Sequence, residues 1–193
     1  PFQNAAARSS LFVVNAVADE TNIVAGVTDT GTNTALVSQT LNFTDTIPFT
    51  NYDSGFLNVT ANVASNPTNQ VSTTISLEQD TYHTAVVGGS GLTANAVTIR
   101  GLTTNIRPTA MRTNINFVNT LRRTDVADNT DVDFYILPAG DALGSNTPQS
   151  EDVSYLEGSS TSISANEQFD LVVTTANTTS ILAGPTRITT TSR

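Results

Sequence analysis

Three residue types are missing from this chain, and each absence excludes a kind of chemistry. The 193 residues contain no Cys, no Lys and no Trp. Without Cys there is no disulfide, thiolate metal site or Cys nucleophile. Without Lys, a Lys–Asn isopeptide cross-link cannot form within the chain. Without Trp, and with only four Tyr, few exposed aromatic platforms for sugars are expected.

Positive charge is also scarce. The chain carries 17 acidic residues against 8 Arg, and its net charge is −9. Nucleic acids and anionic membranes attract clustered cations, so neither is an expected partner. No stretch approaches the roughly 18 apolar residues of a membrane span, so we predict no membrane insertion. Because the sequence starts at Pro1 rather than Met, we expect a processed protein, extracellular or on the cell surface after signal-peptide removal.

The pattern that is present is that of β-strands. Residues 57–63 alternate apolar and polar side chains over their whole length, which is typical of a half-buried antiparallel strand. Turn-forming Gly, Asn, Asp and Pro separate similar short segments and predict an all-β sandwich. The predicted strands of the first half are Leu11–Val17, Ile23–Asp29, Ala35–Phe43, Phe56–Val63, Gln70–Leu77, Tyr82–Val87 and Ala94–Arg100.

This pattern occurs twice, and the second copy is shorter. We predict an N-terminal extension at 1–9, a first module at 10–106 and a second module at 107–193. After the last strand of the second module, nothing corresponds to the strands around Tyr82 and Ala96. The second sandwich is therefore expected to lack its last strands. Its predicted strands are Asn114–Leu121, Val132–Leu137, Asp152–Leu156, Ser160–Ser164, Phe169–Thr175 and Ile181–Thr190.

Several strand motifs carry a family resemblance over about residues 8–190. They include an opening Arg…Phe-Val-Asn pattern in both modules, and the strand Asp131-Val132-Asp133-Phe134-Tyr135. They continue with Phe169–Thr175 followed by Leu182-Ala183-Gly184-Pro185. Together these resemble a family of tandem immunoglobulin-like domains of unknown function in secreted prokaryotic surface proteins. The resemblance implies two immunoglobulin-like antiparallel β-sandwiches and secretion, and it carries over no catalytic residue.

No motif predicts an enzyme or a cofactor. The sole His, His83, lies in a predicted strand, and no G-x-S-x-G elbow accompanies it. An acidic cluster containing Asp128, Asp131 and Asp133 offers oxygen ligands that could hold Ca²⁺, although the EF-hand spacing is absent. Asp131 and Asp133 alternate with Val132 in a predicted strand, which favours a solvated face. We therefore predict no catalytic residue and no cofactor.

The open second module predicts the function instead. Uncovered apolar side chains cost roughly 1.5–3 kcal/mol each, and an open sheet edge recruits other strands. We expect a subunit of an extracellular filament that polymerises with copies of itself by strand complementation. The expected donor residues are Phe2, Ala5, Leu11 and Val13, and the expected acceptor residues are Phe169, Leu171, Val173 and Ile188.

A second hypothesis belongs to a different class of protein. A secreted adhesin or carbohydrate-binding module would act as a monomer and recognise a surface glycan or another cell-surface partner through loops at the sandwich ends.

Overall fold

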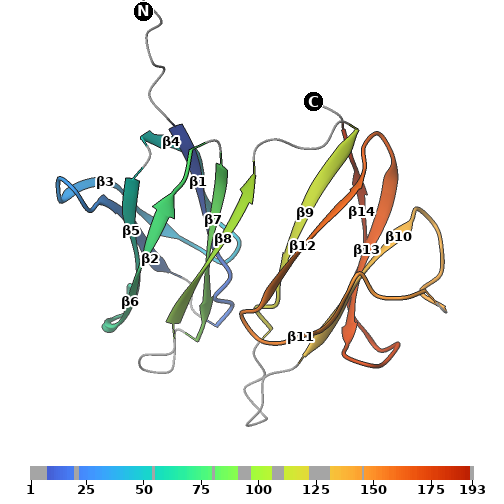
Figure 1. Ribbon diagram of the computed structural model, residues 1–193. Coiled ribbons are helices and arrows are strands. Elements are labelled where there is room, and N and C mark those ends of the chain that lie inside the picture. Colours follow the sequence, from blue (N-terminus) through green and yellow to red (C-terminus); the bar gives the residue numbers. More distant parts are fainter. Residues whose placement is uncertain are drawn as a thin grey trace, which may run out of the picture. The chain divides into compact units, whose positions relative to one another are not determined.

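The computed structural model describes residues 8–19, 22–53, 55–79, 81–90, 97–105, 111–121, 131–144 and 146–191. It confirms the predicted all-β sandwich class, because the described residues form strands and turns and include no helix. Accordingly, none of them belongs to a helix that could cross a membrane. The chain divides into two compact units, unit 1 (Pro1–Arg107) and unit 2 (Pro108–Arg193) (Figure 1).

Unit 1 contains two four-stranded sheets. The first has the order β4-β1-β7-β8, from β1 (Arg8–Asn15), β4 (Thr46–Asp53), β7 (Thr81–Gly89) and β8 (Val97–Asn105). The second has the order β3-β2-β5-β6, from β2 (Ile23–Asp29), β3 (Thr34–Leu41), β5 (Gly55–Val63) and β6 (Asn66–Leu77). Neighbouring strands are antiparallel, with one exception: β1 and β7 run parallel.

The core of unit 1 lies between these sheets, and the alternation in β5 shows why. Leu57, Val59, Ala61 and Val63 are at most 3% exposed, whereas the alternate polar residues of the strand are partly exposed. Since successive side chains of a strand point to opposite faces, the apolar set packs inward. Strand β8 completes this core by packing against β5 and β6.

Unit 2 repeats the second sheet in full and the first sheet in part. Its four-stranded sheet has the order β11-β10-β13-β14, from β10 (Val132–Pro138), β11 (Ser150–Val153), β13 (Gln168–Thr175) and β14 (Ile181–Thr189). Within the described residues, the other sheet contains only β12 (Gly158–Ser164) and β9 (Arg112–Val118). Among the described strands of unit 2, none corresponds to β7 or β8, as predicted.

The strand registers establish which residues of the two units correspond. Val132 lies opposite Val153 and Thr175. Ile23 of unit 1 lies in the same way opposite Leu41 and Val63. Strands β10, β11 and β13 therefore correspond to β2, β3 and β5. By the same reasoning, Leu171 and Val173 correspond to Val59 and Ala61.

A buried Asn explains the repeated Phe-Val-Asn pattern. In unit 1, Asn15 Nδ2 donates to the Leu41 carbonyl (3.1 Å), and Asn15 Oδ1 accepts from the Val17 N–H (2.9 Å). In unit 2, Asn119 Nδ2 donates to the Val153 carbonyl, and its Oδ1 accepts from the Leu121 N–H, both at 2.9 Å. Each Asn thus joins the end of the first strand to the end of the third.

Strand ends elsewhere shift by up to four residues from the prediction, and two strands of unit 1 differ most. Strand β4 was not predicted, because Pro48 and the polar residues after it resemble a turn. Here Pro48 lies in an edge strand, where a missing N–H is tolerated. Strand β8 (Val97–Asn105) extends past the predicted end at Arg100, so residues 101–105 also pair with β7.

Replacing Asn119 by Ala should destabilise unit 2 by about 2 kcal/mol, because two hydrogen bonds are lost and the Val153 carbonyl loses its side-chain donor. Urea denaturation followed by hydrogen exchange in β9 and β11 measures this loss. Asn114→Ala, at an exposed position of β9, is the control and should change stability by less than about 0.5 kcal/mol. Equal effects of the two variants would contradict the assigned role.

Candidate functional site: the open face of unit 2

The narrow sheet of unit 2 leaves β9 with β12 as its only strand partner among the described residues (Figure 1). Strand β1, which corresponds to β9, is paired on both edges, by β4 and by β7. In unit 1 the parallel partner β7 and the next strand, β8, place Ala85, Val87 and Val97 in the core. The described strands of unit 2 have no equivalent of these three side chains.

The inner face of β13 shows the consequence. Phe169, Leu171 and Val173 are all partly exposed. The corresponding residues of unit 1, Leu57, Val59 and Ala61, are at most 3% exposed. The same sheet position is therefore closed in unit 1 and open in unit 2. We call the inner-face residues Phe169, Leu171, Val173 and Ile188 the open face.

The residues that do form the core of unit 2 lie near β9 and β11. The buried cluster consists of Phe117, Val132, Phe134 and Val153. The rings of Phe117 and Phe134 stack with centroids 4.5 Å apart. Leu171 and Val173 pack against this cluster but stay partly exposed. The core is thus complete on the β10 side and incomplete toward β14.

The opposite face of the same sheet is covered. Val172 is 3% exposed and packs with Tyr135 and Leu137, and Leu143 from the segment after β10 lies against them. The unbroken apolar runs at 134–137 and 171–173 are the signal in the sequence for a strand buried on both faces. The open face is therefore the incompletely covered side of β13.

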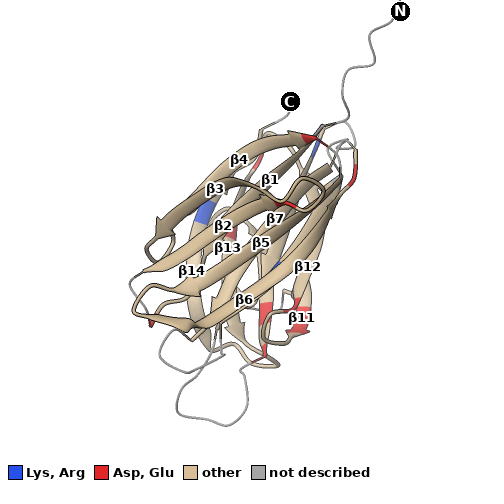
Figure 2. Cartoon of the chain, turned by 90° about the vertical axis from the view of Figure 1, so that its left-hand side faces the viewer, with Lys and Arg blue, Asp and Glu red and all other residues tan. Residues whose placement is uncertain are grey.

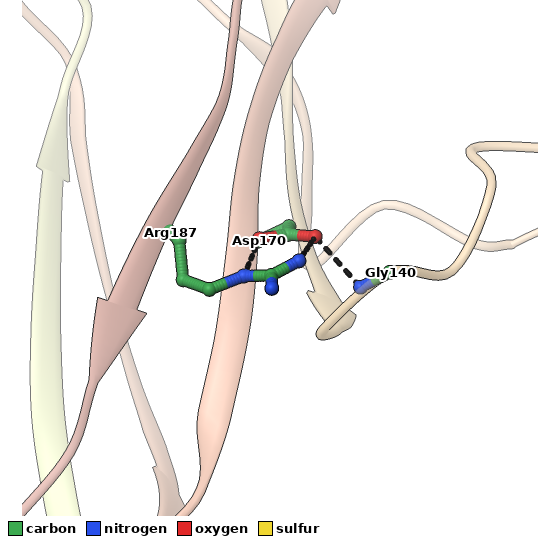
Figure 3. A network of polar contacts seen from close by, with 3 residues as sticks. All are labelled: Gly140, Asp170 and Arg187. Carbon is green, nitrogen blue, oxygen red and sulfur yellow. Dashed lines mark hydrogen bonds and ion pairs between the residues drawn. The ribbon is translucent and has the colours of Figure 1, made fainter.

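Asp170 joins that covering segment to the sheet and also forms an ion pair within the sheet. Asp170 accepts two hydrogen bonds from the Arg187 guanidinium, each 2.8 Å long, and a third of 2.8 Å from the Gly140 N–H (Figure 3). Asp170 and Arg187 are direct neighbours across β13 and β14. The Arg187 hydrogen bonds, with help from Gly140, lower the pKa of Asp170 to about 2. No sequence motif predicts this network, because Gly140 is distant from Asp170 in sequence.

The structure brings the four predicted acceptor residues together. Phe169 lies opposite Ile188 on the neighbouring strand, and Leu171 and Val173 follow at alternate positions of β13. Residues two apart in a strand share a face, so all four line one side of the β13–β14 pair. Whether this face binds another chain stays a prediction.

The predicted donor set must be corrected. Leu11 and Val13 are 1% and 0% exposed, and they belong to the core of unit 1. Because β1 is hydrogen-bonded on both edges, these two residues cannot be donated without opening unit 1. Phe2 and Ala5 lie outside the described residues, so any donor segment from this end of the chain must precede Arg8.

The acidic cluster also differs from expectation. Asp131 is exposed as predicted, but Asp133 is only 3% exposed. Its carboxylate oxygens accept hydrogen bonds from the backbone N–H groups of Asp152 (2.9 Å) and Asn177 (2.8 Å). Both partners have a positive φ, 50° and 58°, so Asp133 holds two tight turns. Asp128 lies outside the described residues, among which no three His or acidic side chains gather as metal ligands.

His83 is buried within unit 1. It is 1% exposed, with Thr81 Oγ1 2.6 Å from Nε2 and Thr103 Oγ1 3.2 Å from Nδ1. Burial lowers the pKa of His83, and the negative charge of Glu78 partly opposes that shift. Both ring nitrogens are thus engaged by Thr hydroxyls within unit 1.

Comparison with known proteins gives no family assignment: no protein-family model matches the chain, and no curated protein matches it significantly. The resemblance to the tandem immunoglobulin-like family therefore stays a prediction.

Replacing Asp133 by Asn should cost about 2 kcal/mol of unit 2 stability, since an amide cannot accept from both backbone N–H groups and loses the charge that strengthens them. Hydrogen exchange in β10 and β13 during urea denaturation reports the change. Asp131→Asn, two residues away and exposed, is the matched control and should be nearly neutral. A similar loss in both variants would contradict the turn-holding role.

Unit 2 should lose stability as the pH falls from about 4 to about 2. The folded pKa of Asp170, about 2, lies below its ordinary value of 3.8, so the unfolded chain takes up the proton first and is favoured by acid in this window. Asp170→Asn should flatten this part of the stability curve, measured by urea denaturation at a series of pH values. Asp141→Asn, in the nearby exposed turn, should leave the curve unchanged; an unaltered curve for Asp170→Asn would overturn the assignment.

Proposed function

We propose that this chain is a structural subunit of an extracellular filament or surface appendage, in which the open face of unit 2 is completed by a β-strand from another copy. The observation that carries the proposal is the contrast between corresponding positions. Leu57, Val59 and Ala61 are closed beneath β7 and β8, while Phe169, Leu171 and Val173 remain partly exposed.

That contrast implies that covering the open face would lower the free energy of unit 2. Full burial of a large apolar side chain is worth roughly 1.5–3 kcal/mol, and a domain is stable by only about 5–15 kcal/mol in total. Completing the cover over several partly exposed residues is therefore a large gain for a small unit. An incoming strand supplies this cover and pairs with the backbone of the sheet at the same time.

Unit 1 provides the geometry of the incoming strand. Strand β7 runs parallel to β1, with Ser10 opposite Tyr82 and Asn15 opposite Val87. It places Ala85 and Val87 in the core, with Thr84 and Val86 alternating to the other face. The donor strand should accordingly run parallel to β9 and carry small or branched apolar residues at alternate positions.

The donor that this chain can offer is the segment before Arg8. It contains Phe2 and a run of alanines at 5–7, and it leads directly into β1, so donation would leave unit 1 closed. Donation from one copy to unit 2 of the next is a head-to-tail contact. Such contacts repeat without closing and so produce filaments.

The test compares the full chain with a variant that lacks residues 1–7. The full chain should form rods in negative-stain micrographs. Its sedimentation coefficient should rise with protein concentration. The shortened variant should stay a monomer, because it keeps the acceptor and loses the donor. Rods from both proteins, or monomers from both, would contradict the proposal.

Cysteine cross-linking identifies the contact directly, because the chain contains no Cys of its own. An Ala5→Cys chain mixed with a Val173→Cys chain should form a disulfide-linked heterodimer. Mixing Ala5→Cys with Thr179→Cys, on an exposed turn, should not. Mass spectrometry of the native polypeptide adds a further test: two more strands that close unit 2 within the same chain would remove the need for a donor.

A further inference from the structure

Unit 1 carries an outer sheet face almost without charge, and no contact within the described part of the chain explains it. The sheet β3-β2-β5-β6 contains a single ionisable residue, Asp29, at the end of β2. Figure 2 views this sheet, and its four strands are drawn almost entirely in tan. The four strands thus hold almost no charge, in a chain whose net charge is −9.

Hydroxyl and amide groups cover this face in regular rows. The inward positions of β2 and β5 hold the core, so the alternate positions point outward. Directly paired residues of neighbouring strands share a face. The resulting rows across the strands are Thr74, Asn58 and Thr28; Ser72, Thr60, Gly26 and Ser38; and Gln70, Asn62, Val24 and Thr40.

The part of the face formed by β5 and β6 is hollowed. A hollow is lined by Asn58, Thr60, Asn62, Gln70 and Ser72, among others. Gly26 lies beside Thr60, and a Cβ atom at Gly26 would stand 2.7 Å from Thr60 Oγ1. A side chain at position 26 would force the Thr60 side chain, which lines the hollow, to move.

The amides around this hollow are available to a ligand. Thr60 makes only a long hydrogen bond of 3.5 Å, to the Gly26 carbonyl. The side chains of Asn58, Asn62 and Gln70 have no hydrogen-bond partner among the described residues. Each amide offers two donors and one acceptor oxygen, which suits a ligand whose own groups both donate and accept.

An exposed aromatic ring stands at one end of the same strand. Phe56 precedes Asn58 by two positions, so it shares the outer face, and its side chain is 59% exposed. Residues 56 to 62 of β5 extend over about 20 Å. Along this line an apolar ring is followed by an amide, a hydroxyl and a second amide.

We propose that this face of unit 1 binds an uncharged polysaccharide. Phe56 stacks against the apolar face of one sugar ring, and Asn58, Thr60, Asn62 and Gln70 exchange hydrogen bonds with the hydroxyl groups of the following units. A phosphate-, sulfate- or carboxylate-bearing ligand would require cations, and the four strands contain none. The site lies in unit 1 and does not depend on strand donation to unit 2.

Affinity electrophoresis of the full chain tests this. The gels contain dextran, mannan or hydroxyethyl cellulose as neutral polymers, and polygalacturonate or chondroitin sulfate as anionic polymers. At least one neutral polymer should retard the protein, with retardation unchanged when salt is added. Phe56→Ala and the double variant Asn58→Ala/Asn62→Ala should each weaken binding about tenfold.

Two matched controls come from the same unit. Phe43→Ala removes another exposed ring, 50% exposed in the turn after β3. Gln39→Ala removes an exposed amide of β3 that lies opposite the inward-facing Ala25. Both should bind like the parent chain. The proposal is overturned if no neutral polymer retards the protein, if an anionic polymer binds equally well, or if the Phe56 and Asn58/Asn62 variants bind normally.

Discussion

Both units depend on the burial of one sheet against another. A sheet with one apolar face is stable only when a second layer removes that face from water. In unit 1 the sheets β4-β1-β7-β8 and β3-β2-β5-β6 match in width, so inner-face residues such as Val59 are fully buried. In unit 2 a two-stranded layer faces a four-stranded one, and the open face results.

A small set of polar anchors fixes the geometry within these layers. Asn15 and Asn119 connect strand ends, and Asp133 holds two turns through their backbone N–H groups. Asp170 joins β13, β14 and the covering segment. In a chain with 13% charged residues, these buried side chains provide positional specificity that apolar packing alone does not.

The two units present their sheets in different ways. The four-stranded sheet of unit 2 is covered outside by the segment around Leu143 and open inside. The corresponding sheet of unit 1 is closed inside, and its outer face carries neutral polar side chains and Phe56. The assembly proposed for unit 2 would use the inner face of this sheet, and the glycan binding proposed for unit 1 would use the outer face of the corresponding sheet.

The sequence was a good guide to strands with strict alternation and to the repeat. Residues 57–63 predicted their strand and its inward face, because the period of two is local information. Strand β4 and the second half of β8 were missed, since Pro48 and the polar residues of these segments resemble turns and linkers. Strand β4 pairs with β1, which is distant in sequence, and in both segments pairing within the sheet overrides local preference.

The roles of individual side chains also depend on whether local sequence or tertiary contacts decide them. The sequence by itself determined the fold class and the two similar β-patterns, both of which follow from the order of apolar and polar residues. Only the tertiary structure decided that Leu11 and Val13 are core residues, that Asp133 is buried, and that Asp170 meets Arg187 and Gly140. The neutral rows on unit 1 likewise arise from strand register, because their members come from four separate strands.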